Sequence, residues 1–313
     1  MNYWNSLAME SLYKDLHKIG EIECQPHAAL APYTSFKIGG ASSMLIRPTS
    51  ISALEQAMEI LERLSIRYNV LGKGTNLLVD DAGIGPVIAI NSLNASPEIV
   101  KQTNGSFYMV QVGAGVKLQA LLAWAINNSL SGLEDFAGIP ASVGGAIFMN
   151  AGANDKSMKD VLSSVLLTGP GGSRWVDVKD LNLSYRSSDL PENSIISAAR
   201  LLLKKEAAPK SIEKIRTIMK KRRISQPLNK ANAGCIFKNP GNTSAGAIID
   251  LCGLKGLTRG DAQVSPIHAN FIVNLGRATS LQVLDLMELI REKVKAETGI
   301  ELKPEIQIWT EKA

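Results

Sequence analysis

Cysteine is scarce in this sequence of 313 residues. The three cysteines, Cys24, Cys235 and Cys252, are odd in number, form no Cys-x-x-Cys pair and have no histidine at metal-ligand spacing. A disulfide framework would use paired cysteines, and a structural zinc site would use clustered Cys and His ligands. We therefore predict neither a disulfide-stabilised scaffold nor a metal centre.

Long hydrophobic runs are also absent. The longest apolar run, Ala120 to Ile126, is too short to cross a bilayer, which takes about 20 residues. The first twenty residues interleave charges with apolar residues and lack the uninterrupted apolar core of a signal peptide. We expect a cytoplasmic protein that does not enter a membrane.

The formal net charge of +5 suits an anionic ligand such as a dinucleotide or a nucleotide sugar, and equally suits weak attraction to nucleic acid. The most basic segment, residues 214–223, places Ile215, Ile218 and Met219 on one helical face, which predicts an amphipathic helix. It lacks the interleaved aromatic side chains on which bases stack. We therefore expect no nucleic-acid partner.

Glycine is concentrated in residues 132–153, GLEDFAGIPASVGGAIFMNAGA, which hold five glycines and neither Lys nor Arg. Glycine at this density weakens regular structure and lets main-chain amides approach a ligand closely. Clustered amides bind a diphosphate without needing a lysine. The pattern predicts a backbone cradle, rather than an ordinary helix or strand, for a large polyoxygenated molecule. We call residues 132–153 the glycine cradle.

A second glycine-rich turn lies in residues 70–79, VLGKGTNLLV, where a short apolar strand leads into Gly72, Gly74, Thr75 and Asn76. We call residues 72–76 the glycine turn and predict that it also contacts phosphate. It is not a P-loop, because Lys-Ser/Thr does not follow at the required spacing, and the third Rossmann glycine is missing. The common nucleotide-binding motifs are therefore excluded.

Hydrophobic periodicity predicts mixed secondary structure. Helices are expected over Ser52–Leu64, with Ser52 and Glu55 as a capping box, around Leu118–Ile126, and from Thr279, capped with Gln282, to Gly299. Residues 204–209 are predicted to link to a C-terminal domain. Strands are expected over residues 44–47, 70–71, 87–90, 107–113, 163–167, 173–178 and 195–203.

Six blocks in order resemble the UDP-N-acetylenolpyruvoylglucosamine reductases, also called UDP-N-acetylmuramate dehydrogenases, from about Tyr33 to Trp309. The blocks are Thr34–Gly40, Gly72–Val79, Ala137–Gly145, Tyr185–Ser188, Ala233–Pro240 and Pro304–Ile306.

The resemblance implies an α+β fold in three parts. Two parts would form an FAD-binding domain of the vanillyl-alcohol-oxidase-like (PCMH-type) class, and the third an α/β substrate domain. The chain's length suggests the shorter type II subclass. The expected divisions are an N-terminal extension over 1–32, FAD-binding subdomains over 33–95 and 96–204, and a substrate-binding domain over 205–313.

The resemblance also implies the reaction. NADPH would reduce FAD, and the flavin would pass hydride to the enolpyruvyl vinyl carbon of a UDP-sugar, giving UDP-N-acetylmuramate for peptidoglycan synthesis. A monomer is favoured. The implied FAD-binding residues are Gly72, Gly74, Thr75, Asn76, Leu77, Ala137, Gly138, Ile139, Pro140, Ser142, Gly144 and Gly145.

Three residues match the family's catalytic positions. Arg186 would grip the carboxylate and the developing enolate with planar, bidentate donors. Glu305 would tune the carbanion site or relay protons. Cys235 stands where familiar members have serine, and its thiol, with an ordinary pKa of about 8.5, would remain a competent acid. The competing interpretation is that Cys235 is a small buried thiol without a role.

The resemblance places Asn239, with Arg223 as its companion, at the substrate phosphates, and Asn270 is a further candidate substrate contact. The lone His268 is assigned no chemistry. Two other functions remain open: a flavin oxidase, which would react rapidly with oxygen and need neither Arg186 nor Glu305, and a non-enzymatic sensor of the UDP-sugar. A sensor would not need a proton donor.

Overall fold

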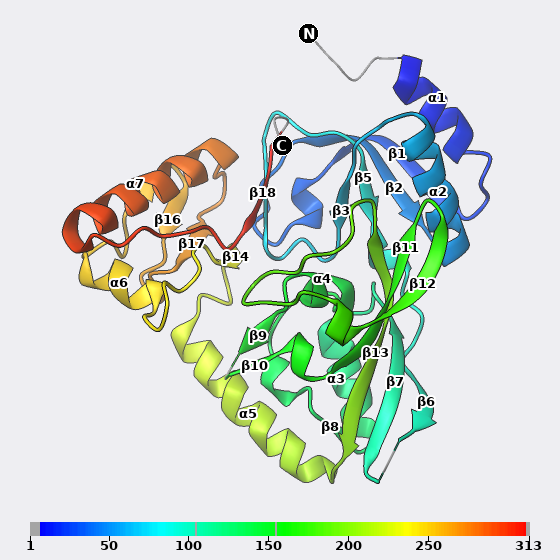
Figure 1. Cartoon of the computed structure of the whole chain (residues 1–313). Coiled ribbons are helices and arrows are strands. Elements are labelled where there is room, and N and C mark those ends of the chain that lie inside the picture. The colour runs from blue at the N-terminus through cyan, green and yellow to red at the C-terminus, as the bar shows by residue number, and fades with distance from the viewer. Residues whose placement is uncertain (1–6, 104, 154, 311–313) are drawn as a thin grey trace. The chain divides into compact units, whose positions relative to one another are not determined.

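The computed structural model describes residues 7–103, 105–153 and 155–310, and Figure 1 follows them from the N-terminal to the C-terminal side. They divide into two compact units. The first unit contains the described residues of 1–27, 43–73 and 85–219, and the second those of 28–42, 74–84 and 220–313. Each unit thus combines segments that are distant in sequence, which differs from the four consecutive divisions expected above.

One sheet of four strands has the order β1 (Ile22–Ala29), β2 (Ala41–Pro48), β5 (Val87–Ala89) and β3 (Asn69–Leu71). The pairings of β5 with β2 and with β3 are parallel. Helices α1 (Leu7–Leu16) and α2 (Ile51–Arg63) pack together in the first unit. Their buried leucines join its hydrophobic core.

The expected helix α2 is confirmed, but its predicted cap is wrong. Ser50, not Ser52, is the N-cap, and its hydroxyl accepts a hydrogen bond from the amide of Ala53 at 3.1 Å. Ser52 lies in the first turn, where it is already helical. A capping serine needs extended backbone, and only Ser50 has it.

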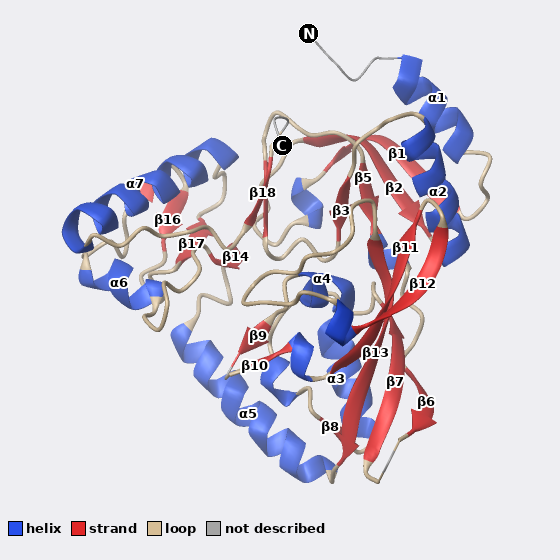
Figure 2. Ribbon diagram, in the orientation of Figure 1, coloured by secondary structure: helices blue, strands red, loops and turns tan. Residues whose placement is uncertain are grey.

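The larger sheet of the first unit is antiparallel and holds its longest strands, which Figure 2 shows as a twisted layer. Helix α4 (Val143–Phe148) packs against β7 and β13, and α2 packs against β11 and β12. The helix α3 (Leu118–Asn127) buries Leu118, Leu121, Leu122 and Ala125, as expected. The strand order is β12 (Gly172–Asp177), β11 (Leu162–Gly169), β13 (Ile195–Lys205), β7 (Phe107–Gly113) and β6 (Glu98–Gln102), with β8 (Leu130–Ser131) on β13.

The glycine cradle contains more regular structure than expected. Besides α4, it includes the 3-10 turn Glu134–Phe136 and strand β9 (Gly152–Ala153), which pairs with β10 (Lys156–Ser157). The prediction that no helix forms here is wrong for Val143–Phe148. Buried Val143, Ala146 and Ile147 stabilise that short helix despite its glycines.

The helix α5 (Ala208–Ser225) begins directly after β13, so Glu206 and Ala207 are all that separate the two elements. The expected linker over 204–209 therefore covers the end of β13, these two residues and the start of α5. As predicted, Ile215, Ile218 and Met219 form an apolar face, which packs on the core of the first unit. The boundary between the units falls inside this helix, after Met219.

The second unit has a four-stranded antiparallel sheet and a separate parallel pair. Helix α7 (Ser280–Thr298) has the predicted capping box of Thr279 and Gln282, and Gly299 ends it with φ 71°. Its core joins apolar residues of α6 and α7 to the sheet. The remaining elements are β14 (Ala231–Cys235), β17 (Phe271–Asn274), β16 (Ala262–Val264), β15 (Thr258–Arg259) and α6 (Ala245–Leu251), with β4 (Leu77–Val79) paired to β18 (Gln307–Trp309).

None of the helices formed by residues 7–103, 105–153 and 155–310 combines the length and apolar character needed to span a membrane.

Candidate functional site

The glycine turn joins β3 to β4. Gly72 and Gly74 lie so close to neighbouring atoms that a side chain at either position would clash. A Cβ on Gly72 would lie 2.7 Å from Oγ of Ser142 in the glycine cradle. A Cβ on Gly74 would lie 2.2 Å from the carbonyl oxygen of Tyr33, and Gly74 has φ +64°. The backbone therefore passes where no side chain fits.

The glycine turn also contains backbone amides that have no hydrogen-bond partner in the described part of the protein. Within the described ranges, no protein acceptor takes a hydrogen bond from the backbone amides of Lys73 and Thr75. Successive free amides in a turn attract phosphate oxygens through their partial positive charge. This donor set fits the diphosphate of a dinucleotide cofactor.

The turn Ala137–Pro140 of the cradle is organised by Gln119 on α3. The Gln119 side chain donates to the carbonyl oxygens of Phe136 at 3.1 Å and Ile139 at 3.0 Å, and its oxygen accepts the amide of Gly138 at 3.2 Å. Sequence reasoning missed this residue. The available signal was an amide side chain in the first turn of a largely apolar helix.

The cradle glycines do not all have the same role. Ser142 caps α4 by accepting the amide of Gly145 at 3.3 Å, and a Cβ on Gly145 would meet only Ser142 Oγ. A Cβ on Gly144, in contrast, would lie 2.9 Å from Cβ of Ala114. Gly144 is therefore accounted for by packing, whereas a Cβ on Gly145 would be restricted by Ser142 Oγ alone, at 3.1 Å.

Two buried acidic residues fasten the cradle to α5. Glu134 accepts a hydrogen bond from Ser211 Oγ at 2.6 Å and another from the amide of Gly132 at 2.9 Å. Asp135 forms an ion pair with Lys214 at 2.6 Å. These bonds fix the start of the cradle within the first unit.

Arg186 lies in a tight turn in which the backbones of Ser184 and Ser187 exchange hydrogen bonds. It has φ +53°, and its guanidinium donates to the carbonyl oxygen of Gly152 at 2.8 Å. Buried Asn150 donates to the Ser184 carbonyl oxygen at 2.9 Å. The predicted catalytic arginine is thus attached to the C-terminal end of the cradle, and Asn150 is a second residue that sequence reasoning missed.

Cys235 and Glu305 lie on neighbouring backbone segments of the second unit. Cys235 ends β14 after a register shift, and the next residue, Ile236, accepts the amide of Glu305 at 2.7 Å. The amide of Lys238 donates to the carbonyl oxygen of Lys303 at 2.8 Å and continues the pairing. The structure therefore brings together two of the three predicted catalytic residues.

Arg222, near the end of α5, interacts electrostatically with Cys235. Burial lowers the pKa of the Arg222 guanidinium, and the Cys235 thiolate acts in the opposite direction. Arg223, the predicted substrate contact, is exposed. A cation beside a thiol favours its thiolate.

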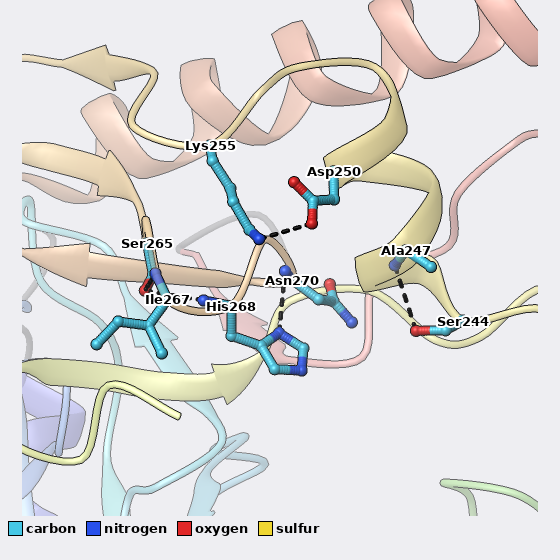
Figure 3. Close-up of polar contacts among 8 residues, drawn as sticks. All are labelled: Ser244, Ala247, Asp250, Lys255, Ser265, Ile267, His268 and Asn270. Carbon is cyan, nitrogen blue, oxygen red and sulfur yellow. Dashed lines mark hydrogen bonds and ion pairs between the residues drawn. The ribbon is translucent and has the colours of Figure 1, made fainter. Parts of the chain in front are cut away.

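The predicted substrate residues differ in their surroundings. Asn239 is exposed, although its side-chain oxygen accepts the amide of Ala245, the first residue of α6, at 3.0 Å. Asn270 is 3% exposed, and its side chain bonds to the backbone of Phe237. Figure 3 shows the backbone N–H of Asn270 donating to Nδ1 of His268, near the ion pair of Lys255 and Asp250. These contacts favour a structural role for Asn270.

Comparison with known proteins assigns a class to this arrangement. The family model of the FAD binding domain matches residues 42–176, which include both glycine-rich segments. The model of the C-terminal domain of UDP-N-acetylenolpyruvoylglucosamine reductase matches residues 226–309. The chain is therefore an FAD-dependent oxidoreductase with an FAD-binding domain and a separate C-terminal domain.

Relatives over nearly the whole chain identify the family. A UDP-N-acetylenolpyruvoylglucosamine reductase of Syntrophobacter fumaroxidans is 39% identical over 94% of this chain and 86% of its own length. That of Chlamydia pneumoniae is 40% identical over 88% of each chain. The crystal structure of the enzyme from Thermus caldophilus is 36% identical, with a TM-score of 0.77 over 92% of this chain and 99% of its own. The chain belongs to the UDP-N-acetylenolpyruvoylglucosamine reductase family.

These comparisons confirm the predicted family, the α+β flavoprotein fold and the FAD cofactor. The glycine turn and the cradle fit that cofactor, because they combine free amides with positions that exclude side chains.

Proposed function

We propose that the protein reduces the enolpyruvyl group of UDP-N-acetylglucosamine-enolpyruvate to UDP-N-acetylmuramate, using NADPH as the hydride donor, in peptidoglycan precursor synthesis. Family membership supports the reaction class. The observation that carries the residue roles is the backbone pairing that sets Glu305 beside the segment following Cys235. The enzyme would act as a monomer in the cytoplasm.

When bound, FAD would supply the chemistry of hydride transfer between NADPH and the vinyl carbon of the sugar substrate. The protein's part is to hold the cofactor. The amides of the glycine turn would face its diphosphate, and the Ala137–Pro140 turn with Ser142 and Gly145 would line its path. The structure-based role of Gly144 is to let α4 pack against Ala114.

Cys235 would deliver the proton to the carbon next to the one that receives hydride. A thiol is a stronger acid than the alcohol of a serine, so it can donate this proton. The neighbouring Arg222 would stabilise the thiolate left after proton transfer. Glu305, held by Ile236, would tune the same centre or relay the replacement proton.

Arg186 would bind the substrate carboxylate and stabilise the negative charge that develops during the reaction. Its planar guanidinium suits bidentate recognition of a carboxylate. The Gly152 bond and the left-handed backbone hold it in one geometry before substrate arrives. Arg223 and Asn239 remain candidate contacts to the UDP diphosphate.

The test is NADPH oxidation by the purified, FAD-loaded protein with and without the enolpyruvyl sugar. Oxidation that requires the sugar supports the reductase. Rapid oxygen consumption without any need for Arg186 or Glu305 would indicate an oxidase. Sugar binding without nicotinamide oxidation would indicate a sensor.

The role of Cys235 is tested with Cys235→Ala in deuterated water. Loss of turnover supports its assignment as the acid. Unchanged turnover with unchanged deuterium at the protonated carbon would overturn it.

A further inference from the structure

Asn270 joins strand β17 to the backbone that follows Cys235. Its carbonyl oxygen accepts the amide of Ile236 at 2.8 Å. Its side-chain oxygen accepts the amide of Phe237 at 3.0 Å, and its side-chain nitrogen donates to the Phe237 carbonyl oxygen at 2.8 Å. The Asn270 side chain therefore makes the same two hydrogen bonds with Phe237 that the backbone of a paired strand residue would make.

This clamp is placed where ordinary strand pairing fails. Strand β14 shifts register between Asn232 and Cys235, and Gly234 between them has φ +81°. Such a bulge re-aims the side chains beside it and interrupts the ladder. Asn270 restores backbone pairing directly after Cys235, and this pairing fixes the orientation of the Cys235 side chain.

The same segment also holds Glu305. Ile236 receives the amide of Glu305 on its carbonyl oxygen while its own amide donates to Asn270. The backbone of Ile236, the residue after Cys235, is thus bonded to both Asn270 and Glu305. Asn270 is itself held by His268, whose Nδ1 accepts the Asn270 amide at 3.2 Å (Figure 3).

We propose that Asn270 is a positioning residue, which orients Cys235 for proton transfer, rather than a contact to the sugar. This inference rests on the proposed function. Its 3% exposure leaves little surface for a substrate, and both ends of its amide are engaged by Phe237. Misplacement of a reacting group by about 1 Å can slow an enzyme about a hundredfold, so a clamp of this kind matters for rate.

Strand β17 offers a matched control in Asn274. It is 6% exposed and also uses both ends of its amide. Its nitrogen donates to the Phe36 carbonyl oxygen at 3.0 Å, and its oxygen accepts the amides of Gly276 and Ala278 at 2.8 and 3.0 Å. Asn274→Asp thus makes the same isosteric change on the same strand, away from Cys235.

The experiment compares Asn270→Asp and Asn270→Ser with Asn274→Asp in the FAD-loaded protein. Three quantities are measured: the rate of flavin reduction by NADPH, the dissociation constant of the enolpyruvyl sugar, and the rate at which saturating sugar reoxidises the reduced flavin. The alkylation rate of Cys235, followed by peptide mass spectrometry with Cys24 and Cys252 as internal references, reports the thiol without requiring turnover.

For the Asn270 variants we expect sugar-driven reoxidation to slow by about tenfold to a hundredfold. Reduction by NADPH and the sugar dissociation constant should stay within about twofold of wild type, because neither uses the oriented thiol. Cys235 alkylation should become faster as its segment loosens. Asn274→Asp should match wild type in all four measurements.

Weaker sugar binding with unchanged reoxidation would overturn the proposal and restore Asn270 as a substrate contact. Equal effects of the Asn270 and Asn274 variants, or failure of both Asn270 variants to retain FAD, would overturn it in favour of a purely structural role. If wild-type flavin is not reoxidised by the sugar, the proposed function fails instead, which separates the two conclusions.

Discussion

The two regions assigned to cofactor and to chemistry are built in opposite ways. The glycine turn and the cradle offer backbone amides and exclude side chains at Gly72 and Gly74. The region of Cys235 and Glu305 offers side chains, which are set in place by backbone pairing between distant segments. The first region therefore requires the absence of side chains at particular glycines, and the second requires particular functional groups. Substitutions in the first should change cofactor binding, and substitutions in the second should change the rate of the reaction.

The largest effect is expected at Cys235. Cys235→Ala removes the proposed acid and should lower kcat by about a hundredfold to ten-thousandfold, whereas Cys235→Ser should keep a larger share of activity. Steady-state NADPH oxidation with the enolpyruvyl sugar measures both. Cys252→Ala, at the end of α6, is the control that should leave kcat unchanged. A wild-type kcat for Cys235→Ala would show that this region does not depend on the Cys235 side chain.

The next effect concerns shape rather than chemistry. Gly72→Ala would push a methyl group to within 2.7 Å of Ser142 Oγ, so the turn or the α4 cap must shift. We expect FAD to bind about tenfold more weakly, which corresponds to about 1.4 kcal/mol. Equilibrium titration of the apoprotein with FAD measures the change. Gly171→Ala is the matched control, because its added Cβ would meet no atom within 4 Å; equal FAD affinities for the two variants would contradict the close-approach argument.

A smaller effect is expected where a side chain supports the cofactor region indirectly. Gln119→Ala leaves the Gly138 amide and the carbonyl oxygens of Phe136 and Ile139 without their partner. The free energy of unfolding should fall by about 1–3 kcal/mol. Urea denaturation measures it, with Gln56→Ala on the exposed face of α2 as the comparison. Equal stability of the two variants would show that solvent replaces these bonds.

The smallest effect is a pH dependence in the second unit. Burial makes the largest contribution and lowers the pKa of His268. A hydrogen bond with its own backbone opposes this, and the weaker charge effects of Lys255 and Asp250 act in opposite directions. The unfolded chain therefore binds a proton more readily than the folded one. Stability from this residue is fully present above the ordinary histidine pKa and is lost as pH falls toward the lowered value.

His268→Asn keeps an acceptor for the Asn270 amide but cannot titrate. Urea unfolding at neutral and mildly acidic pH should therefore show a shallower loss of stability in the variant than in wild type. Exposed His17→Asn is the control and should reproduce the wild-type difference. Parallel pH dependence of wild type and His268→Asn would refute the assignment.

The two regions also differed in how far the sequence could predict them. Glycine density marked both segments that we propose hold FAD, because a backbone that must approach a ligand leaves a local compositional signal. The capping box at Thr279 and the apolar face of α5 were also predicted, since their patterns are local. The family resemblance, not spacing, supplied Cys235, Arg186 and Glu305, and their roles stay predictions.

What sequence reasoning missed depends on long-range bonds. Gln119, Asn150 and the clamp of Asn270 act through hydrogen bonds to backbone far along the chain. No local period marks such a residue. The α4 helix was missed for a related reason, because burial of Val143, Ala146 and Ile147 outweighs the low helix propensity of its glycines.

The parallel pair of β4 and β18 has a consequence for how the protein matures. The side chain of Asn76, in the glycine turn, donates to the carbonyl oxygen of Glu305, and the Asn76 carbonyl oxygen accepts the amide of Gln307. On the ribosome, the glycine turn emerges long before these partners do. Non-local pairing of this kind forms late, because the loop must close first. Flavin loading is therefore expected only after residues 305–307 have been translated and have paired with the glycine turn.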